Sequence, residues 1–182
     1  MRIIAGNLKG RQLYTPADRR IRPTSDKVKE ALFNMAAFYL EDAVVVDLFS
    51  GTGNLGIEAI SRGAKRTYFC DKSRSSITLI CKNIEHCGVS EKAVLLQGDF
   101  EKTLDKIPEA ADLILLDPPY KKGLLHKCLE KIQQLELLRE DGIIIAEHGS
   151  DQELEDSIFN FVKEKEKKYG TIVLSLYKHK NE

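Results

Sequence analysis

The chain has 182 residues and a mass of 20.6 kDa, which is the size of about one domain. Hydrophobic residues make up 42% of it and charged residues 31%, with 28 basic residues against 28 acidic ones, and this composition excludes a disordered chain. No apolar run approaches the roughly 20 residues that span a bilayer, and the first residues lack the apolar stretch of a signal peptide. We therefore expect a soluble, cytoplasmic protein without a membrane partner.

The N-terminal segment is basic even though the net charge of the whole chain is zero. Residues 1–30 carry eight Lys and Arg residues against three Asp and Glu residues. A local excess of positive charge is typical of a surface that binds a polyanion. A solvated, partly flexible arm would have the same composition, so charge alone leaves both interpretations open.

Apolar periodicity predicts helices and strands along the whole chain. The first helix is expected over Ser25–Leu40, before any strand. Strands are then expected, in chain order, over Ala43–Leu48, Arg66–Cys70, Ala93–Gln97, Leu113–Leu116 and Ile143–Glu147. Helices are expected between and after them over Leu55–Arg62, Ser73–His86, Phe100–Ile107, Leu124–Leu138 and Asp151–Ile158, with Gly63 and Gly88 as stops. Two last strands, Phe159–Lys165 and Thr171–Tyr177, flank Tyr169-Gly170 as in a closing hairpin.

This alternation of strands and helices predicts right-handed βαβ crossovers. The expected fold is a doubly wound α/β domain with a mostly parallel, seven-stranded, Rossmann-like sheet. A C-terminal antiparallel hairpin and a short N-terminal extension complete it.

The cysteines suggest a metal site at first sight, because Cys81 and Cys87 lie near His86. However, both cysteines share helical spacing with Ile80 and Ile84, which makes one apolar stripe. Cysteine often packs as a small core hydrophobe. We therefore expect core packing here, and neither a metal ion nor a disulfide framework.

A glycine-rich loop follows the first strong strand. Gly51, Gly53 and Gly56 fit the G-x-G-x-x-G spacing, in which glycines allow a tight turn and let a ligand approach bare backbone at a helix N-terminus. Alone, the motif is weak, because it suits both nicotinamide cofactors and S-adenosylmethionine.

Three acids at successive strand ends favour S-adenosylmethionine. Asp47 ends the first strand, where a carboxylate would repel a pyrophosphate but attract a cationic amino acid group. Asp71 ends the second strand and can hold two ribose hydroxyls, and Asp99 follows the third and can accept from an adenine amine. These positions lie at the edge where open α/β sheets bind ligands. The pattern resembles the S-adenosylmethionine-dependent methyltransferases. The expected cofactor-binding residues are Asp47, Phe49, Ser50, Gly51, Thr52, Gly53, Asp71, Lys72, Asp99 and Phe100.

The tetrapeptide after the fourth strand carries the expected chemistry. Asp117, Pro118, Pro119 and Tyr120 could be a plain strand terminator, because prolines donate no backbone hydrogen bond. A more specific interpretation explains all four residues. The Asp117 carboxylate and the Pro118 carbonyl can accept from the two hydrogens of an exocyclic amine, and Tyr120 can stack on the extruded base. D-P-P-Y after this glycine loop is similar to the signature of enzymes that methylate adenine N6, cytosine N4 or guanine N2.

Residues 2–11 and 22–34, together with D-P-P-Y, resemble the RsmD family, and the resemblance extends over essentially the whole chain. Members of this family are bacterial small-subunit rRNA methyltransferases that modify one guanine at N2. Lys27 and Lys29 stand where members often have arginine, and lysine keeps the attraction for phosphate but loses the bidentate fork.

The resemblance implies methyl transfer from S-adenosylmethionine to the N2 amine of guanine 966 (usual numbering) of 16S rRNA, within the assembled or assembling small ribosomal subunit. It implies that Arg11, Arg22 and Lys27 face rRNA phosphates and that Thr24 shapes the mouth of the pocket. It also implies an RNA-facing extension and helix over residues 1–40, a methyltransferase domain over residues 41–182, and a monomer.

Other functions remain open on the residues themselves. A DNA adenine-N6 methyltransferase would use D-P-P-Y in the same way, to hold its target amine. However, the chain has no room for a separate target-recognition domain. A catalytically silent RNA-binding assembly factor would not need the intact tetrapeptide at Asp117–Tyr120. A nicotinamide oxidoreductase leaves the tetrapeptide unexplained.

Overall fold

The computed structural model describes residues 1–16, 25–119 and 123–180. Within these ranges one sheet has the strand order β3-β2-β1-β4-β5-β8-β7-β6. The strands are β1 Val44–Leu48, β2 Arg66–Asp71, β3 Ala93–Gln97, β4 Ala111–Leu116, β5 Leu138–Gly149, β6 Ser157–Ile158, β7 Phe161–Tyr169 and β8 Ile172–His179. β1 to β5 are parallel, and β8, β7 and β6 add antiparallel pairs. The expected fold is confirmed, and the one additional strand is the two-residue β6.

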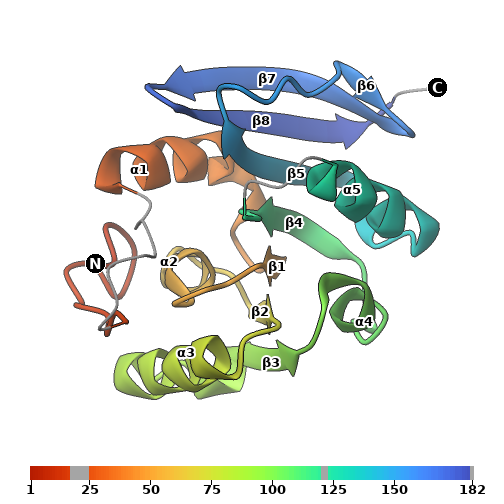
Figure 1. Cartoon of the computed structure of the whole chain (residues 1–182). Coiled ribbons are helices and arrows are strands. Elements are labelled where there is room, and N and C mark those ends of the chain that lie inside the picture. The colour runs from red at the N-terminus through yellow and green to blue at the C-terminus, as the bar shows by residue number, and fades with distance from the viewer. Residues whose placement is uncertain (17–24, 120–122, 181–182) are drawn as a thin grey trace.

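Helices cover both faces of this sheet (Figure 1). They are α1 Asp26–Met35, α2 Asn54–Ser61, α3 Arg74–Cys87, α4 Phe100–Leu104 and α5 Leu124–Gln134, with 3-10 turns at Ala37–Tyr39 and Ser90–Lys92. α1, α2 and α3 pack on one face through two apolar clusters. α4 and α5 pack on the other face through a third cluster. The sheet is therefore doubly wound, as the alternating pattern predicts. None of the described helices has the length and apolarity needed to cross a bilayer.

Glycines fix the approach of α2 to the sheet and the end of α3. A Cβ at Gly56 would lie 2.2 Å from Cε1 of Phe69, so only glycine lets α2 come this close to β2. Gly88 caps α3 with φ of 69°, a left-handed conformation that favours glycine. The helix stop expected at Gly88 is thus confirmed.

Strand register brings the carboxyl ends of the parallel strands level with one another. Leu48 pairs with both Cys70 and Leu116. Leu116 pairs in turn with Ala146 of β5. The residues that follow this row, among them Asp71, Asp117 and Glu147, therefore stand side by side at one edge of the sheet.

Two expected elements differ from the structure. The helix expected over Asp151–Ile158 is wrong, because turns and β6 occupy this segment. The carbonyls of Leu154 and Glu155 accept hydrogen bonds from Lys163 and Tyr177, so they are unavailable to a helix. The helix expected to run to Leu138 ends instead at Gln134, because Glu136 takes a positive φ of 48° and β5 begins at Leu138.

The N-terminal segment is attached to α1 and α2 by a buried ion pair. Lys29 Nζ lies 3.0 Å from Oε2 of Glu58, and both side chains are fully buried. Glu58 also accepts from the backbone amides of Ile4 and Ala5 at 2.9 and 3.0 Å. The expectation that Lys29 keeps an attraction for phosphate is wrong, because its ammonium is enclosed and neutralised by Glu58.

Cys81 also departs from the expected helical stripe. It is exposed on α3, whereas Cys87, Ile80 and Ile84 are buried in the apolar cluster that contacts β2. The stripe is therefore narrower than the spacing predicts, because Cys81 lies just past its edge.

Candidate active site

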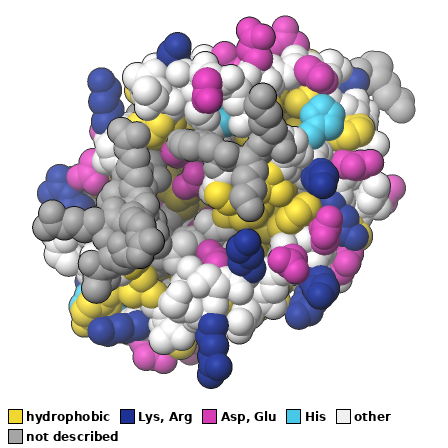
Figure 2. All heavy atoms as spheres, viewed as in Figure 1, with side chains coloured by type: hydrophobic (Ala, Val, Ile, Leu, Met, Phe, Trp, Pro, Cys, Tyr) yellow, Lys and Arg dark blue, Asp and Glu magenta, His cyan; other side chains and the backbone are white. Residues whose placement is uncertain are grey.

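A pocket lies at the edge formed by the carboxyl ends of the parallel strands, with a volume of about 420 Å³. It brings together the ends of β1, β2 and β4 and the first turns of α3 and α4. Eight of the residues expected at the site line it, namely Phe49, Gly51, Asp71, Lys72, Asp99, Phe100, Asp117 and Pro119. In the view of Figure 2, acidic side chains occupy a recess near the middle of the molecule, next to hydrophobic side chains.

The glycine loop is held in place by the acid at the end of β2. Gly51 N donates to Oδ2 of Asp71 at 2.9 Å, and Oδ1 of the same carboxylate accepts from Ser73 N at 2.8 Å. Phe49 and Gly51 have positive φ angles of 72° and 57°, which turn the backbone sharply after β1. Asp71 therefore positions the loop and still presents free lone pairs to the pocket.

Asp47, Ser50, Thr52 and Gly53 do not line this pocket. Asp47 is almost fully buried and its Oδ2 accepts from Gly56 N at 2.9 Å, so it holds the first turn of α2. Burial, followed by the charges of Asp117 and Asp71, raises the pKa of Asp47 to about 7. The Ser50 hydroxyl accepts from Cys70 N at 3.0 Å and thus ties the loop to β2.

The pocket residues fit S-adenosylmethionine by their chemistry. Asp71 and Asp99 supply carboxylate acceptors for ribose hydroxyls and an adenine amine at neighbouring strand ends. Phe49 and Phe100 provide apolar walls, with ring centroids 6.2 Å apart. Ser76, Thr103 and Leu124 also line the pocket, although the sequence motifs did not identify them. Their positions depend on how α3, α4 and α5 begin, which no short motif specifies.

Asp117 lies at the end of β4 and lines the pocket together with Pro119. Burial raises the pKa of Asp117 to about 6, so its carboxyl is mostly ionised at neutral pH. Pro118 between them is buried, and Tyr120 lies outside the described residues. The acid of the tetrapeptide therefore lies in the same pocket as several of the expected cofactor-binding residues.

Glu147 is a neighbour of this site that the sequence motifs missed. It follows the apolar run of β5 and is 4% exposed. Burial, followed by the charge of Asp117, raises the pKa of Glu147 to about 8. The rule that singles out Asp47, Asp71 and Asp99, an acid at a strand end, would also have identified Glu147.

The expected RNA-binding residues lie outside the pocket where they are described. Arg11 is exposed, and its Nη1 donates to the His86 carbonyl at 3.3 Å, near the C-terminal end of α3. Lys27 is exposed on α1. Arg22 and Thr24 lie outside the described residues.

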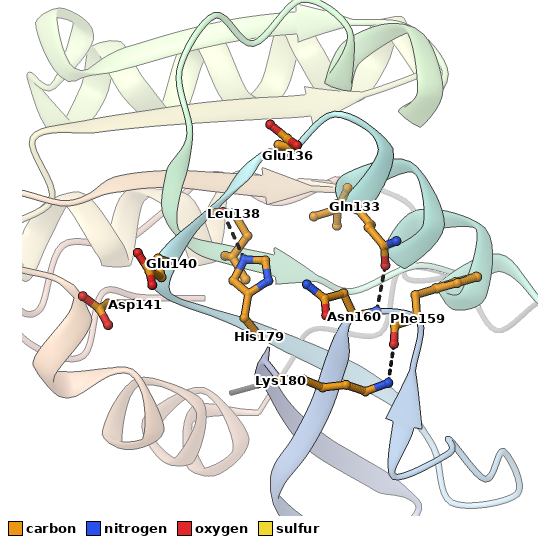
Figure 3. A pocket seen from close by; sticks show the side chains of 10 residues that line it. Gln133, Glu136, Leu138, Glu140, Asp141, Phe159, Asn160, His179 and Lys180 are labelled. Atoms are coloured by element: carbon orange, nitrogen blue, oxygen red, sulfur yellow. Dashed lines mark hydrogen bonds between the residues drawn. The ribbon is translucent and has the colours of Figure 1, made fainter. Parts of the chain in front are cut away.

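A larger hollow of about 980 Å³ lies at the opposite edge of the sheet. Figure 3 shows it between the end of α5, the start of β5 and the loop before β7. Several of its polar groups bond within the protein, since Lys180 Nζ donates to the Phe159 carbonyl and Gln133 Oε1 accepts from Asn160 N. Open α/β sheets bind ligands at the carboxyl ends of their strands, so the smaller pocket is the candidate active site.

Comparison with known proteins finds relatives that match nearly the whole chain and a solved structure with the same fold. The family model described as Conserved hypothetical protein 95 matches residues 1–178. The chain is 38% identical to YlbH of Bacillus subtilis, over 98% of each protein. It is 32% identical to Ribosomal RNA small subunit methyltransferase D of Haemophilus influenzae, over 98% of this chain and 94% of the relative. The solved structure of yhhF from Escherichia coli matches with a TM-score of 0.90 and 27% identity, covering 100% of this chain and 99% of that one. The chain therefore belongs to the Conserved hypothetical protein 95 family, which is the RsmD family of rRNA methyltransferases.

Proposed function

We propose that this protein is an rRNA methyltransferase that transfers a methyl group from S-adenosylmethionine to the exocyclic N2 amine of one guanine of 16S rRNA. The observation that carries the proposal is the single pocket in which Asp71 and Asp99 lie together with Asp117. Ribosomal RNA is the substrate named for the Haemophilus influenzae relative, which matches nearly the whole chain. The small ribosomal subunit and this particular guanine are part of the proposal.

The cofactor would be held by the residues that line the pocket. Asp71 would accept from the ribose hydroxyls, Asp99 from the adenine amine, and Phe49 and Phe100 would flank the adenine ring. Asp47 does not line the pocket, and its ionised form would attract the cationic amino acid group from behind the glycine loop. S-adenosylmethionine supplies, when bound, an electrophilic methyl group on a positively charged sulfur.

The tetrapeptide would prepare the target amine. The Asp117 carboxylate and the Pro118 carbonyl would each accept from one amine hydrogen. The lone pair of this amine is delocalised into the base ring, and two acceptors favour the sp³-like nitrogen that can act as a nucleophile. Catalysis of this kind depends on positioning and electrostatics, without a covalent intermediate. The base would have to leave its stack to reach the pocket.

The decisive experiment is to incubate the protein with labelled S-adenosylmethionine and small ribosomal subunits that lack the modification, and then to identify the methylated nucleoside. We expect N2-methylguanosine from one site. A parallel incubation with DNA that yields labelled N6-methyladenine, while the subunits stay unlabelled, would favour the DNA methyltransferase alternative. Cofactor binding without any transfer would favour an assembly factor.

The rate of methyl transfer is expected to fall as the pH drops through about 6, because protonation of Asp117 removes an acceptor for the amine. The sign follows from the pKa. The carboxyl is ionised and active above about 6 and is neutral below it. A single-turnover pH–rate profile at saturating cofactor tests this expectation. A rate that stays flat down to pH about 4, the ordinary range of an aspartate, would exclude a requirement for ionised Asp117.

Asp71→Ala is expected to weaken cofactor binding by roughly tenfold or more, because it removes the acceptors for two ribose hydroxyls and also releases the Gly51 amide. Isothermal titration calorimetry with S-adenosylmethionine measures this effect. Asp151→Ala, at an exposed position beyond β5, is the matched control. Equal affinities for Asp71→Ala and the wild type would remove Asp71 from the site.

A further inference from the structure

Three carboxyl groups lie on one face of the sheet at the edge that forms the candidate active site. Asp47, Asp117 and Glu147 belong to the neighbouring strand ends of β1, β4 and β5. Leu115 and Ile145, two residues before Asp117 and Glu147, pack in the apolar cluster under α1 and α2. Side chains alternate along a strand, so Asp117 and Glu147 project to that same face.

Asp117 and Glu147 are direct neighbours across two parallel strands. They follow the paired residues Leu116 and Ala146. Adjacent strands lie roughly 4.8 Å apart, so the two carboxyl groups are close to each other. The negative charge of Asp117 accordingly acts on Glu147.

Glu147 is nonetheless an acceptor without a donor. Its Oε2 is buried and has no hydrogen-bond partner among the residues that the structure describes. Leaving a buried carboxyl oxygen unpaired is costly. Asp47, in contrast, is also buried but accepts from Gly56 N and helps to build α2. A structural role of that kind is therefore not visible for Glu147, and the missing donor points to a ligand.

The chemistry of nucleobases indicates which donor fits. The N2 amine of guanine is flanked by N1–H, a donor, and by N3, an acceptor. The N6 amine of adenine and the N4 amine of cytosine are flanked by ring nitrogens that carry lone pairs. In its ionised form, a carboxylate beside the target amine would attract the N1–H of guanine, and this hydrogen bond would in turn favour the ionised form. The same carboxylate would repel the ring lone pair of the other two bases.

We infer that Glu147 selects guanine by accepting a hydrogen bond from the ring N1–H while Asp117 and the Pro118 carbonyl hold the adjacent N2 amine. This inference rests on the proposed function and names the residue that reads the base. It also orients the base, because N1 lies toward β5 and the N3 and ribose side lies away from Glu147.

The inference is tested with two substrates that share the reacting amine. Small subunits are reconstituted with guanosine or with 2-aminopurine riboside at the target position. 2-Aminopurine keeps the N2 amine but carries a lone pair at N1. The ratio of kcat/KM values, guanine over 2-aminopurine, is measured at pH about 8.5, where Glu147 with a pKa of about 8 is mostly ionised.

The wild type is expected to prefer guanine by about tenfold to a hundredfold, since 2-aminopurine leaves the Glu147 oxygen unpaired. In Glu147→Gln the amide can turn either its carbonyl or its NH₂ toward N1, so the preference should fall by about tenfold. Glu153→Gln removes the same charge at an exposed site and should keep the wild-type ratio. Each ratio is measured on one enzyme preparation, so partial unfolding of a variant cancels.

Two results would overturn this role of Glu147: a wild type that methylates both bases equally, or a Glu147→Gln variant that keeps the full preference. A wild type that methylates guanine in neither subunits nor free rRNA would overturn the proposed function, and the inference with it. Guanine methylation without a preference over 2-aminopurine leaves the proposed function intact and rejects only the inference.

Discussion

Asp117→Ala is expected to lower the rate of methyl transfer by about a hundredfold to a thousandfold, the range for removing one preorganised electrostatic partner of a reacting group. The carboxylate at the end of β4 is one of two acceptors proposed to hold the target amine, and its removal leaves only the Pro118 carbonyl. Affinity for S-adenosylmethionine should change little, because Asp71 and Asp99 remain in the pocket. Single-turnover methylation and calorimetry measure the two quantities separately.

Asp141→Ala is the matched control for this variant. Asp141 is exposed at the opposite edge of the sheet, beside the larger hollow in Figure 3. Its replacement should leave both the rate and the affinity as in the wild type. Near-normal turnover of Asp117→Ala would refute the proposed role. A parallel loss of cofactor affinity would move Asp117 from the amine to the cofactor.

Glu58→Ala should lower the free energy of unfolding by about 3–5 kcal/mol, the usual cost of breaking a buried ion pair by removing one partner. The Lys29 ammonium would remain fully buried without its carboxylate. The amides of Ile4 and Ala5 and the guanidinium of Arg62 would also lose their acceptor. Small domains are stable by only about 5–15 kcal/mol, so urea denaturation should show a large shift of the midpoint.

A double variant separates the buried charge from the packing. Lys29→Met with Glu58→Gln removes both charges and keeps a carbonyl oxygen for the backbone amides. Replacing a whole buried pair costs far less than removing one half of it, so this protein should be more stable than Glu58→Ala. If the double variant proves the less stable of the two, the unpaired charge of Lys29 is not the source of the loss. If Glu58→Ala unfolds as the wild type does, the buried charge is not what holds the N-terminal segment.

The parallel half of the sheet could be predicted because local signals and tertiary packing agree there. β3 runs over Ala93–Gln97 as expected, because a short apolar run between a helix stop and a glycine is typical of a buried strand. The start of β5 could not be predicted. Arg139, Glu140 and Asp141 are exposed and polar, yet they belong to the strand because Leu138 pairs with Ala111 of β4.

The candidate site was predictable in part. Acids at strand ends and the proline pair mark Asp71, Asp99 and Asp117 without any three-dimensional information. Lys29 illustrates the opposite case. A lysine in a basic segment suggests a surface charge, and only the packing of α1 against α2 reveals that Glu58 encloses it. Residues that contact each other but are distant in sequence leave no local pattern. Burial of this kind can therefore be recognised only from the three-dimensional structure.

The position of β8 has a consequence for the order of events during protein synthesis. β8 lies between β5 and β7, although it is the last strand to be translated. Its residues Leu174 and Val173 pair with Glu147 and His148. Until residue 179 has left the exit tunnel, β5 is an open edge that other chains can join. The nascent chain therefore lacks the β8 partner of Glu147 until this last strand has emerged.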